Sequence, residues 1–329
     1  MKSPDDCAII AKMKFVFFDI ECACVHKTCA KTCAFGYVVC DENFNISEKR
    51  DILINPLGKF ELTDRKGEKG IVLPYEYEEF KKFPSFPEVY ETIKELLEDK
   101  DTYVLGHSVL NDVKYLNLET ARFHLPSFNF RFSDSQLIYM TVINDFSHQF
   151  GLETIAESLN VEFTPHRAAD DAYAAMRIVE AMCRADNCSY SSLMDKYNLT
   201  PGKISNYSIS APLSGGFRLF NREKRKLREE RSRKRVKFNQ YFSKKRYIKG
   251  GRLSGEFYTF SRAIEDDVEK AVRLVDNIYG QGGRYTQQME LCRVYVRSDD
   301  DDSGRMRKAL ANRKIKIINL DELTELLDD

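Results

Sequence analysis

The sequence lacks a long apolar run. None of its stretches approaches the roughly 18 consecutive apolar residues that a membrane-spanning helix needs. The amino terminus also lacks a signal-peptide pattern, because residues 1–6 are polar and the apolar run around residues 15–20 is interrupted by Asp19 and Glu21. These absences argue against a membrane partner and predict a cytoplasmic protein. With 43% hydrophobic and 31% charged residues, the composition is typical of a globular chain.

A regular cysteine framework is missing as well. The chain has nine cysteines, an odd number, and they cluster unevenly. In a chain of this size this distribution favours free thiols in a reducing compartment, so we expect no disulfides. Cys22, Cys24, His26, Cys29 and Cys33 lie close enough in sequence to suggest zinc, but they do not form two Cys-x-x-Cys pairs. Free thiols are therefore the preferred interpretation of this cluster too.

There is no net charge, because 51 Lys and Arg balance 51 Asp and Glu. The balance hides an asymmetry: residues 218–252 hold 16 basic and 3 acidic residues, which leaves 35 basic and 48 acidic residues in the rest of the chain. Basic side chains interleaved with Phe and Tyr can follow a phosphate backbone and stack on bases. A solvated linker helix, or a partner for the acidic segments on either side, is the alternative interpretation.

The length predicts two domains, since single cores stop growing near 250–300 residues. In the first, short strand-like runs give way to alternating strands and helices. The strand-like runs lie at 15–20, 33–40, 51–56 and 102–107. The helical patterns lie at 86–99, 109–123, 134–145, 152–159 and 168–183. This order predicts an α/β domain over residues 1–190, with a sheet covered by helices.

Beyond residue 190 the sequence becomes rich in Ser, Pro and Gly and then strongly basic, so we assign residues 191–249 to a partly helical linker. A second, smaller α/β unit is predicted over residues 250–329. Its strand-like runs lie at 255–261, 291–296 and 315–319, and its helical patterns at 264–278, 305–312 and 320–327. No internal repeat is visible.

Paired carboxylates mark the first strand. Asp19 and Glu21 stand two residues apart on an apolar strand, so both side chains project from the same side of the sheet. Two such carboxylates repel each other and are costly to desolvate, and Mg²⁺ or Mn²⁺ would neutralise both. Two strand-end carboxylates that face water are the alternative. A third carboxylate, Asp112, follows the buried strand that ends at Gly106 and His107, near the first turn of a helix.

His166 precedes the last helix of this domain, and Asp171 falls in the first turn of that helix. A histidine on a loop, with an unperturbed pKa of about 6.5, suits a base that takes a proton from water near neutral pH. The alternative is a surface histidine beside a helix whose Asp170 and Asp171 only favour the helix dipole.

Taken in order, these stretches resemble the DEDDh proofreading-type exonucleases, which have the RNase H-like fold with a mixed five-stranded sheet. The resemblance covers roughly residues 13–183 and rests on the motifs FFDIE, GHSVLND and HRAADDA. All five positions of the family pattern are filled. The matching residues are Asp19, Glu21, Asp112, His166 and Asp171.

This resemblance implies a two-metal mechanism, in which the four matching carboxylates hold two Mg²⁺ or Mn²⁺ ions about 4 Å apart. One ion lowers the pKa of a water that His166 deprotonates for attack on the terminal phosphodiester, and the other stabilises the leaving 3′ oxygen. The product would be a nucleoside 5′-monophosphate. Asp134 and Asp170 lie beside the matching positions, and we interpret both as structural.

From about residue 250 to 327 the chain resembles a BRCT domain. The resemblance rests on the Gly282-Gly283 turn, the strand CRVYV and the stretch SGRMRKALANRKIKIINLDELTELL. It departs from the usual pattern because the final helix has no Trp and Arg305 stands where Lys is common. The resemblance therefore implies a DNA or protein partner in preference to a phosphopeptide. A domain that only packs is the alternative.

The sequence thus predicts a metal-dependent 3′–5′ exonuclease that hydrolyses DNA, with single strands favoured. The BRCT-like segment is the reason for preferring DNA. An exoribonuclease is one alternative, because the same metals cleave both nucleic acids and discrimination depends on contacts with the 2′-hydroxyl. A non-catalytic nucleic-acid-binding adaptor on a nuclease scaffold is the other.

Overall fold

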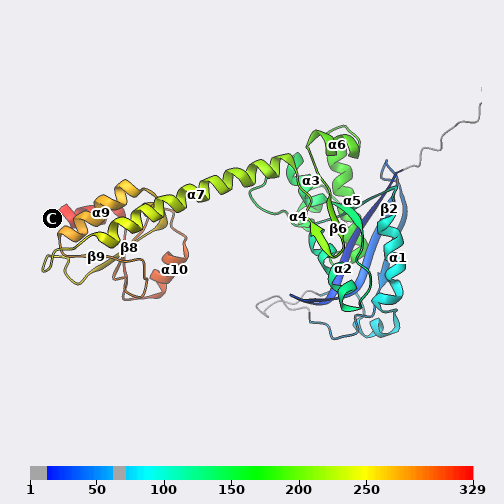
Figure 1. Cartoon of the computed structure of the whole chain (residues 1–329), viewed down its shortest axis with the longest axis horizontal. Helices are drawn as coiled ribbons and strands as arrows, with labels where there is room; N and C mark the ends of the chain where they lie inside the picture. Colours follow the sequence, from blue (N-terminus) through cyan, green and yellow to red (C-terminus); the bar gives the residue numbers. More distant parts are fainter. Residues whose placement is uncertain (1–12, 62–71, 329) are drawn as a thin grey trace, which may run out of the picture. The chain divides into compact units, whose positions relative to one another are not determined.

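The computed structural model describes residues 13–61 and 72–328, and the chain divides into two compact units after Phe220. The first unit contains a seven-stranded mixed sheet with the strand order β3-β2-β1-β4-β5-β6-β7 (Figure 1). Its strands are β1 (Lys14–His26), β2 (Cys29–Cys40), β3 (Ile46–Leu53), β4 (Thr102–Gly106), β5 (Phe130–Asp134), β6 (Gly202–Ser205) and β7 (Ser208–Ser210). Strands β1, β4 and β5 are parallel neighbours, whereas β2 and β3 on one side and β6 and β7 on the other pair antiparallel.

The helices of this unit cover both faces of the sheet. They are η1 (Tyr77–Lys82), α1 (Phe86–Glu98), α2 (Leu110–Arg122), α3 (Ser135–Val142), α4 (Leu152–Ser158), α5 (Ala168–Ala185) and α6 (Tyr190–Lys196). Alternation along β1 divides the core: Val16 and Phe18 pack in one cluster with α1 and α2, while Phe15 and Phe17 pack in another with α3, α5 and α6. The predicted mixed α/β architecture of this half is confirmed.

The sheet has seven strands, where the sequence predicts five. The prediction missed β6 and β7, which fall inside the residues assigned to the linker. These strands have four and three residues, and their sequences GKIS and SIS alternate too little between apolar and polar residues to be predicted as strands. Strand β6 pairs with the edge of β5 and β7 pairs with β6, so the first unit extends to Phe220.

The second unit has a four-stranded, all-parallel sheet in the order β11-β10-β8-β9. Its strands are β8 (Phe257–Phe260), β9 (Arg284–Tyr285), β10 (Val294–Val296) and β11 (Lys316–Ile318), and its helices are α8 (Arg262–Asp266), α9 (Val268–Gly280), α10 (Gly304–Ala311) and α11 (Leu320–Asp328). The end of the 30-residue helix α7 (Gly215–Lys244) belongs to the same core, because Phe238 is fully buried and its ring centroid lies 5.1 Å from that of Tyr285.

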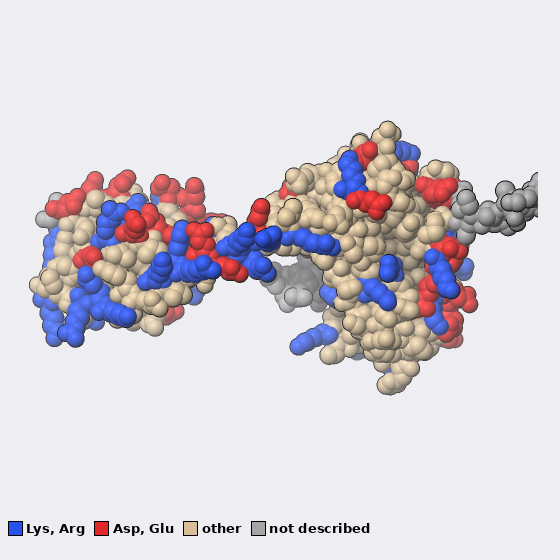
Figure 2. Space-filling model, turned by 45° about the horizontal axis from the view of Figure 1, so that its top comes forward, with Lys and Arg blue, Asp and Glu red and all other residues tan. Residues whose placement is uncertain are grey.

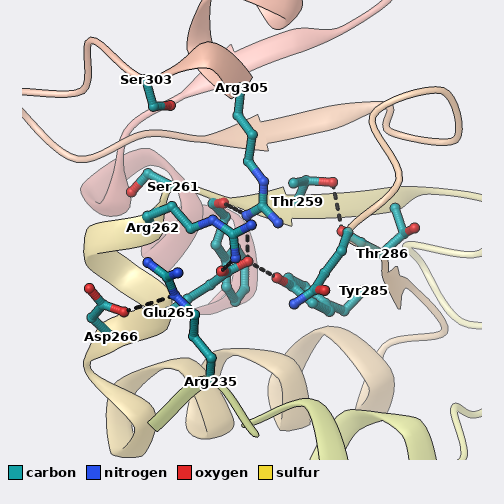
Figure 3. A network of polar contacts seen from close by, with 12 residues as sticks. Arg235, Thr259, Ser261, Arg262, Glu265, Asp266, Tyr285, Thr286, Ser303 and Arg305 are labelled. Atoms are coloured by element: carbon teal, nitrogen blue, oxygen red, sulfur yellow. Dashed lines mark hydrogen bonds and ion pairs between the residues drawn. The ribbon is translucent and has the colours of Figure 1, made fainter. Parts of the chain in front are cut away.

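A buried polar network holds the second unit together (Figure 3). Glu265 is completely enclosed and accepts hydrogen bonds from Arg262 at 2.7 Å, from Arg305 at 2.5 Å and from the Tyr285 hydroxyl. Arg305 also donates to the carbonyl oxygen of Phe260 at 2.9 Å. A buried carboxylate is stable only when it is paired in this way. The guanidinium of Arg305 is thus engaged within the fold.

Among the helices that the structure describes, none is both long and apolar enough to span a membrane.

Candidate active site

Strand β1 presents the first two carboxylates of the site. Asp19 and Glu21 continue the face of the strand on which Phe15 and Phe17 pack toward α5, so both point toward the beginning of that helix. A register shift in the pairing with β2 follows directly after Glu21. Such a bulge commonly re-aims side chains at a functional site.

A glycine in the neighbouring strand lets α5 approach the sheet. Gly36 pairs with Asp19 on one side and with Asp51 on the other, which forms a row across β1, β2 and β3. A Cβ atom at Gly36 would lie 2.0 Å from the Ala168 carbonyl carbon and 2.0 Å from the Ala169 nitrogen. The first turn of α5 therefore lies directly on the glycine backbone, beside Asp19.

Asp51 and Tyr75 fix the beginning of α5. The N-cap residue Arg167 makes no side-chain cap, and the helix N–H groups are satisfied from elsewhere. Ala169 donates its backbone N–H to Asp51 at 2.7 Å, and Ala168 donates to the Tyr75 hydroxyl at 3.0 Å. The Arg167 guanidinium also contacts Asp51 at 3.1 Å. These bonds hold the helix turn that carries Asp171.

His166 lies in the loop before α5 with a left-handed backbone, φ 63°. Its Nδ1 is 3.7 Å from Glu21 Oε1, and its side chain is 45% exposed. The backbone N–H of His166 hydrogen-bonds to the Asp171 carboxylate. Ligand atoms of Glu21, His166 and Asp171 all lie within 4.8 Å of one another. The loop thus places an accessible imidazole against the carboxylates.

Asp112 reaches the site from the first turn of α2 and is buried. Its carboxylate lies close enough to Asp19 and Glu21 to be repelled by both charges, and it accepts a hydrogen bond from the backbone N–H of Ile20. Asp134 supports the loop that leads into α2. Its carboxylate accepts the backbone N–H of Ser108 at 3.0 Å while it also caps α3.

The electrostatics of the site disfavour four ionised carboxylates. Burial raises the pKa of Asp19 to about 7, and the charge of Asp51 adds to the effect. Burial together with the charges of Asp19 and Asp171 raises the pKa of Glu21 to about 9, and burial with Asp19 raises that of Asp171 to about 8. The pKa of Asp112 also rises well above its usual value, mainly through burial. Clustered carboxylate oxygens of this kind fit hard divalent cations such as Mg²⁺ or Mn²⁺.

The structure brings all five sequence-predicted residues together, and their catalytic and metal-binding roles remain a prediction. Asp170 is directed elsewhere, to Lys49 at 2.5 Å. Sequence reasoning missed Gly36, Asp51 and Tyr75. Only Gly36 left a signal in the sequence, since a glycine inside an apolar strand often marks a close backbone approach.

The sequence of the first unit matches a protein family. Residues 16–179, about half of the chain, match the family model RNase_T, described as exonuclease. This segment is an exonuclease domain, so the predicted enzyme class, an exonuclease and therefore a hydrolase, is confirmed. No curated protein matches the chain.

Several solved structures are similar to this chain. A full-length 3′-exonuclease shares 16% identity over 62% of this chain and 68% of its own, with a TM-score of 0.48. The nuclease domain of 3′hExo, a DEDDh family member bound to rAMP, shares 17% identity over 54% of this chain and 95% of its own, with a TM-score of 0.46. E. coli Exonuclease I in complex with a 5cy-dT13 oligonucleotide shares 16% identity over 56% of this chain and 42% of its own, with a TM-score of 0.41.

Proposed function

We propose that the protein is a metal-dependent 3′–5′ exonuclease that releases nucleoside 5′-monophosphates from DNA, with single strands preferred. The observation that carries this proposal is the meeting of four carboxylates with one accessible imidazole on an exonuclease domain. The 3′–5′ direction rests on the DEDDh pattern of these five residues. The preference for DNA rests on the BRCT-like character of the second unit.

Asp19, Glu21, Asp112 and Asp171 would hold two Mg²⁺ or Mn²⁺ ions. The raised pKa values of all four support this, because a cation would offset both the burial and the repulsion that favour protonation. When bound, the ions would stabilise charge on the phosphate oxygens and favour ionisation of the attacking water.

His166 is the proposed general base. Its Nδ1 lies 3.7 Å from Glu21 Oε1, and its Nε2 would accept the proton of the attacking water. The exposed position of the ring allows substrate to reach it. Asp51, Tyr75 and Gly36 would act on the reaction only through position, because they fix the turn that bears Asp171 beside β1.

Helix α7 is strongly basic, and we propose that it contacts the nucleic-acid backbone. Figure 2 shows Lys and Arg side chains gathered along its length. Within the helix, residues 218–244 hold 12 basic and 3 acidic residues. Arg231 and Arg235 form ion pairs with Asp266 at 3.9 and 3.5 Å, so these two side chains also stabilise the second unit. The BRCT-like unit would add a DNA or protein partner.

The test uses the full chain with 3′-labelled and 5′-labelled single-stranded DNA and RNA, in Mg²⁺, Mn²⁺ or EDTA. We expect stepwise shortening of DNA from its 3′ end and none in EDTA. Asp171→Asn should abolish activity, whereas Asp170→Asn, its neighbour on the same helix turn, should retain most of it. Retention of the labelled strand without shortening would instead support the adaptor. A faster reaction on RNA would support the exoribonuclease.

A further inference from the structure

A second group of metal-ligating side chains lies beyond the active site, at the tip of the hairpin formed by β1 and β2. Cys24 pairs with Lys31, and His26 pairs with Cys29 across a two-residue turn. Alternate residues of a strand share a face, and directly paired residues point the same way. Cys24, His26 and Cys29 therefore project from one side of the hairpin.

Glu61 joins this face from a distant segment. Its backbone N–H donates to the carbonyl oxygen of Ala23 at 2.7 Å, which fixes it alongside β1. Its Oε2 lies 3.4 Å from His26 Nε2 and 3.7 Å from Cys24 Sγ. Ligand atoms of Cys24, His26 and Glu61 all fall within 4.8 Å of one another. A thiol, an imidazole and a carboxylate thus converge on one point.

We propose that Cys24, His26 and Glu61 form a zinc-binding site, with Cys29 as the fourth ligand. Sulfur and nitrogen ligands select zinc over Mg²⁺, which prefers oxygen alone, so this site and the active site would take different metals. The Cys29 thiol lies outside the 4.8 Å group and would join it by side-chain rotation from its place opposite His26. The ligand set would then be two sulfurs, one nitrogen and one oxygen.

Cys24 lies on the inner side of this group of ligands. The residue is buried, whereas His26 and Glu61 are exposed, so an ion would be held from within and reached from solvent. Zinc would bind Cys24 as the thiolate and displace its proton.

Four protein ligands would make the site closed and structural, with no open position for substrate. It would tie the end of β1 to the segment at Glu61. Because β1 also carries Asp19 and Glu21, this anchor would hold the strand end that follows the active site. This zinc site does not depend on the proposed exonuclease activity.

The experiment measures zinc bound to the purified full chain after dialysis against excess Mg²⁺, and zinc affinity by competition with a chelator. We expect one zinc ion per chain. Its affinity should fall by at least about 100-fold in His26→Ala and in Glu61→Gln, since losing even a supporting residue around a metal costs about 10- to 100-fold. Both residues are exposed, so the variants should fold, which circular dichroism checks.

Two further variants separate this site from other possibilities. Cys188→Ser removes a partly buried thiol elsewhere and should keep the zinc. Asp19→Ala removes an active-site carboxylate and should also keep the zinc. Zinc binding can therefore be measured whether or not the protein has the proposed exonuclease activity. Co²⁺ in place of zinc should show a sulfur-to-metal charge-transfer band that is weaker in Cys24→Ser and absent from the double variant Cys24→Ser/Cys29→Ser. A chain without stoichiometric zinc, or equal affinity in folded His26→Ala, would overturn the proposal.

Discussion

Replacing Gly36 by alanine should damage the active site although the residue touches no substrate. The added Cβ would lie 2.0 Å from two backbone atoms of α5, whereas ordinary contacts lie at 3.4–4 Å. Backbone atoms cannot rotate away, so the first turn of α5 must shift by roughly 1 Å or more. A displacement of about 1 Å in an active site can lower the rate by about 100-fold.

The same substitution should cost about 1–3 kcal/mol of unfolding free energy, the usual range for overpacking. The assay is the single-turnover rate of nucleotide release at saturating Mg²⁺, together with urea unfolding. Gly151→Ala is the matched control in the same unit, because a Cβ there would meet only Thr154 Oγ1 at 3.9 Å. We expect it to keep both rate and stability.

The two measurements separate misplacement from unfolding. A folded Gly36→Ala protein with a rate reduced about 100-fold supports the role of the close approach. A folded variant with the rate of the Gly151→Ala control would contradict this role of Gly36, because it would show that Asp171 acts without the close approach of α5 to the strand.

Three other perturbations test the electrostatics. Burial raises the pKa of Asp19 from about 4 in the unfolded chain to about 7 in the fold, so the metal-free fold loses stability as pH rises through this range. Urea unfolding in EDTA should show the free energy of unfolding falling with pH, and Mg²⁺ should reduce that fall. Arg222→Ala, Arg228→Ala and Arg233→Ala each remove one basic side chain from α7. The slope of log binding constant against log salt concentration for single-stranded DNA should become shallower by about 0.7 for each phosphate contact that is lost, and an unchanged slope would exclude the contact. Glu265→Ala should destabilise the second unit by about 3–5 kcal/mol in urea unfolding, because two arginines lose their buried partner, and a loss below about 1 kcal/mol would contradict the network in Figure 3.

The candidate site was largely predictable because its signals are local. Asp19 and Glu21 share a face through strand alternation, and Asp112 and Asp171 occupy the first turns of helices whose patterns are readable from sequence. His166 directly precedes the second of these helices. Short-range periodicity therefore placed these residues on their strands and helices, and the resemblance to the DEDDh pattern singled them out as a site; neither showed what holds them together.

The second unit shows where local patterns fail. Helix α7 has almost no apolar face, so the sequence indicates a linker through residue 249. In the structure Phe238 is buried against Tyr285, more than forty residues away along the chain. Phe242, one helical turn further on, packs on the same tyrosine, but two aromatic positions in a basic run are too short a pattern to assign the end of the helix to the second unit.

The α/β class of the first unit was readable from the sequence because strand and helix periods are encoded within a few neighbouring positions, and the five candidate residues were readable from their match to the DEDDh motifs. Tertiary structure alone decided the rest. The row of Asp19, Gly36 and Asp51, with α5 lying across it, requires three strands and a helix to meet. The approach of Glu61 to Cys24 likewise joins residues 37 positions apart, and such contacts depend on the path of the whole chain.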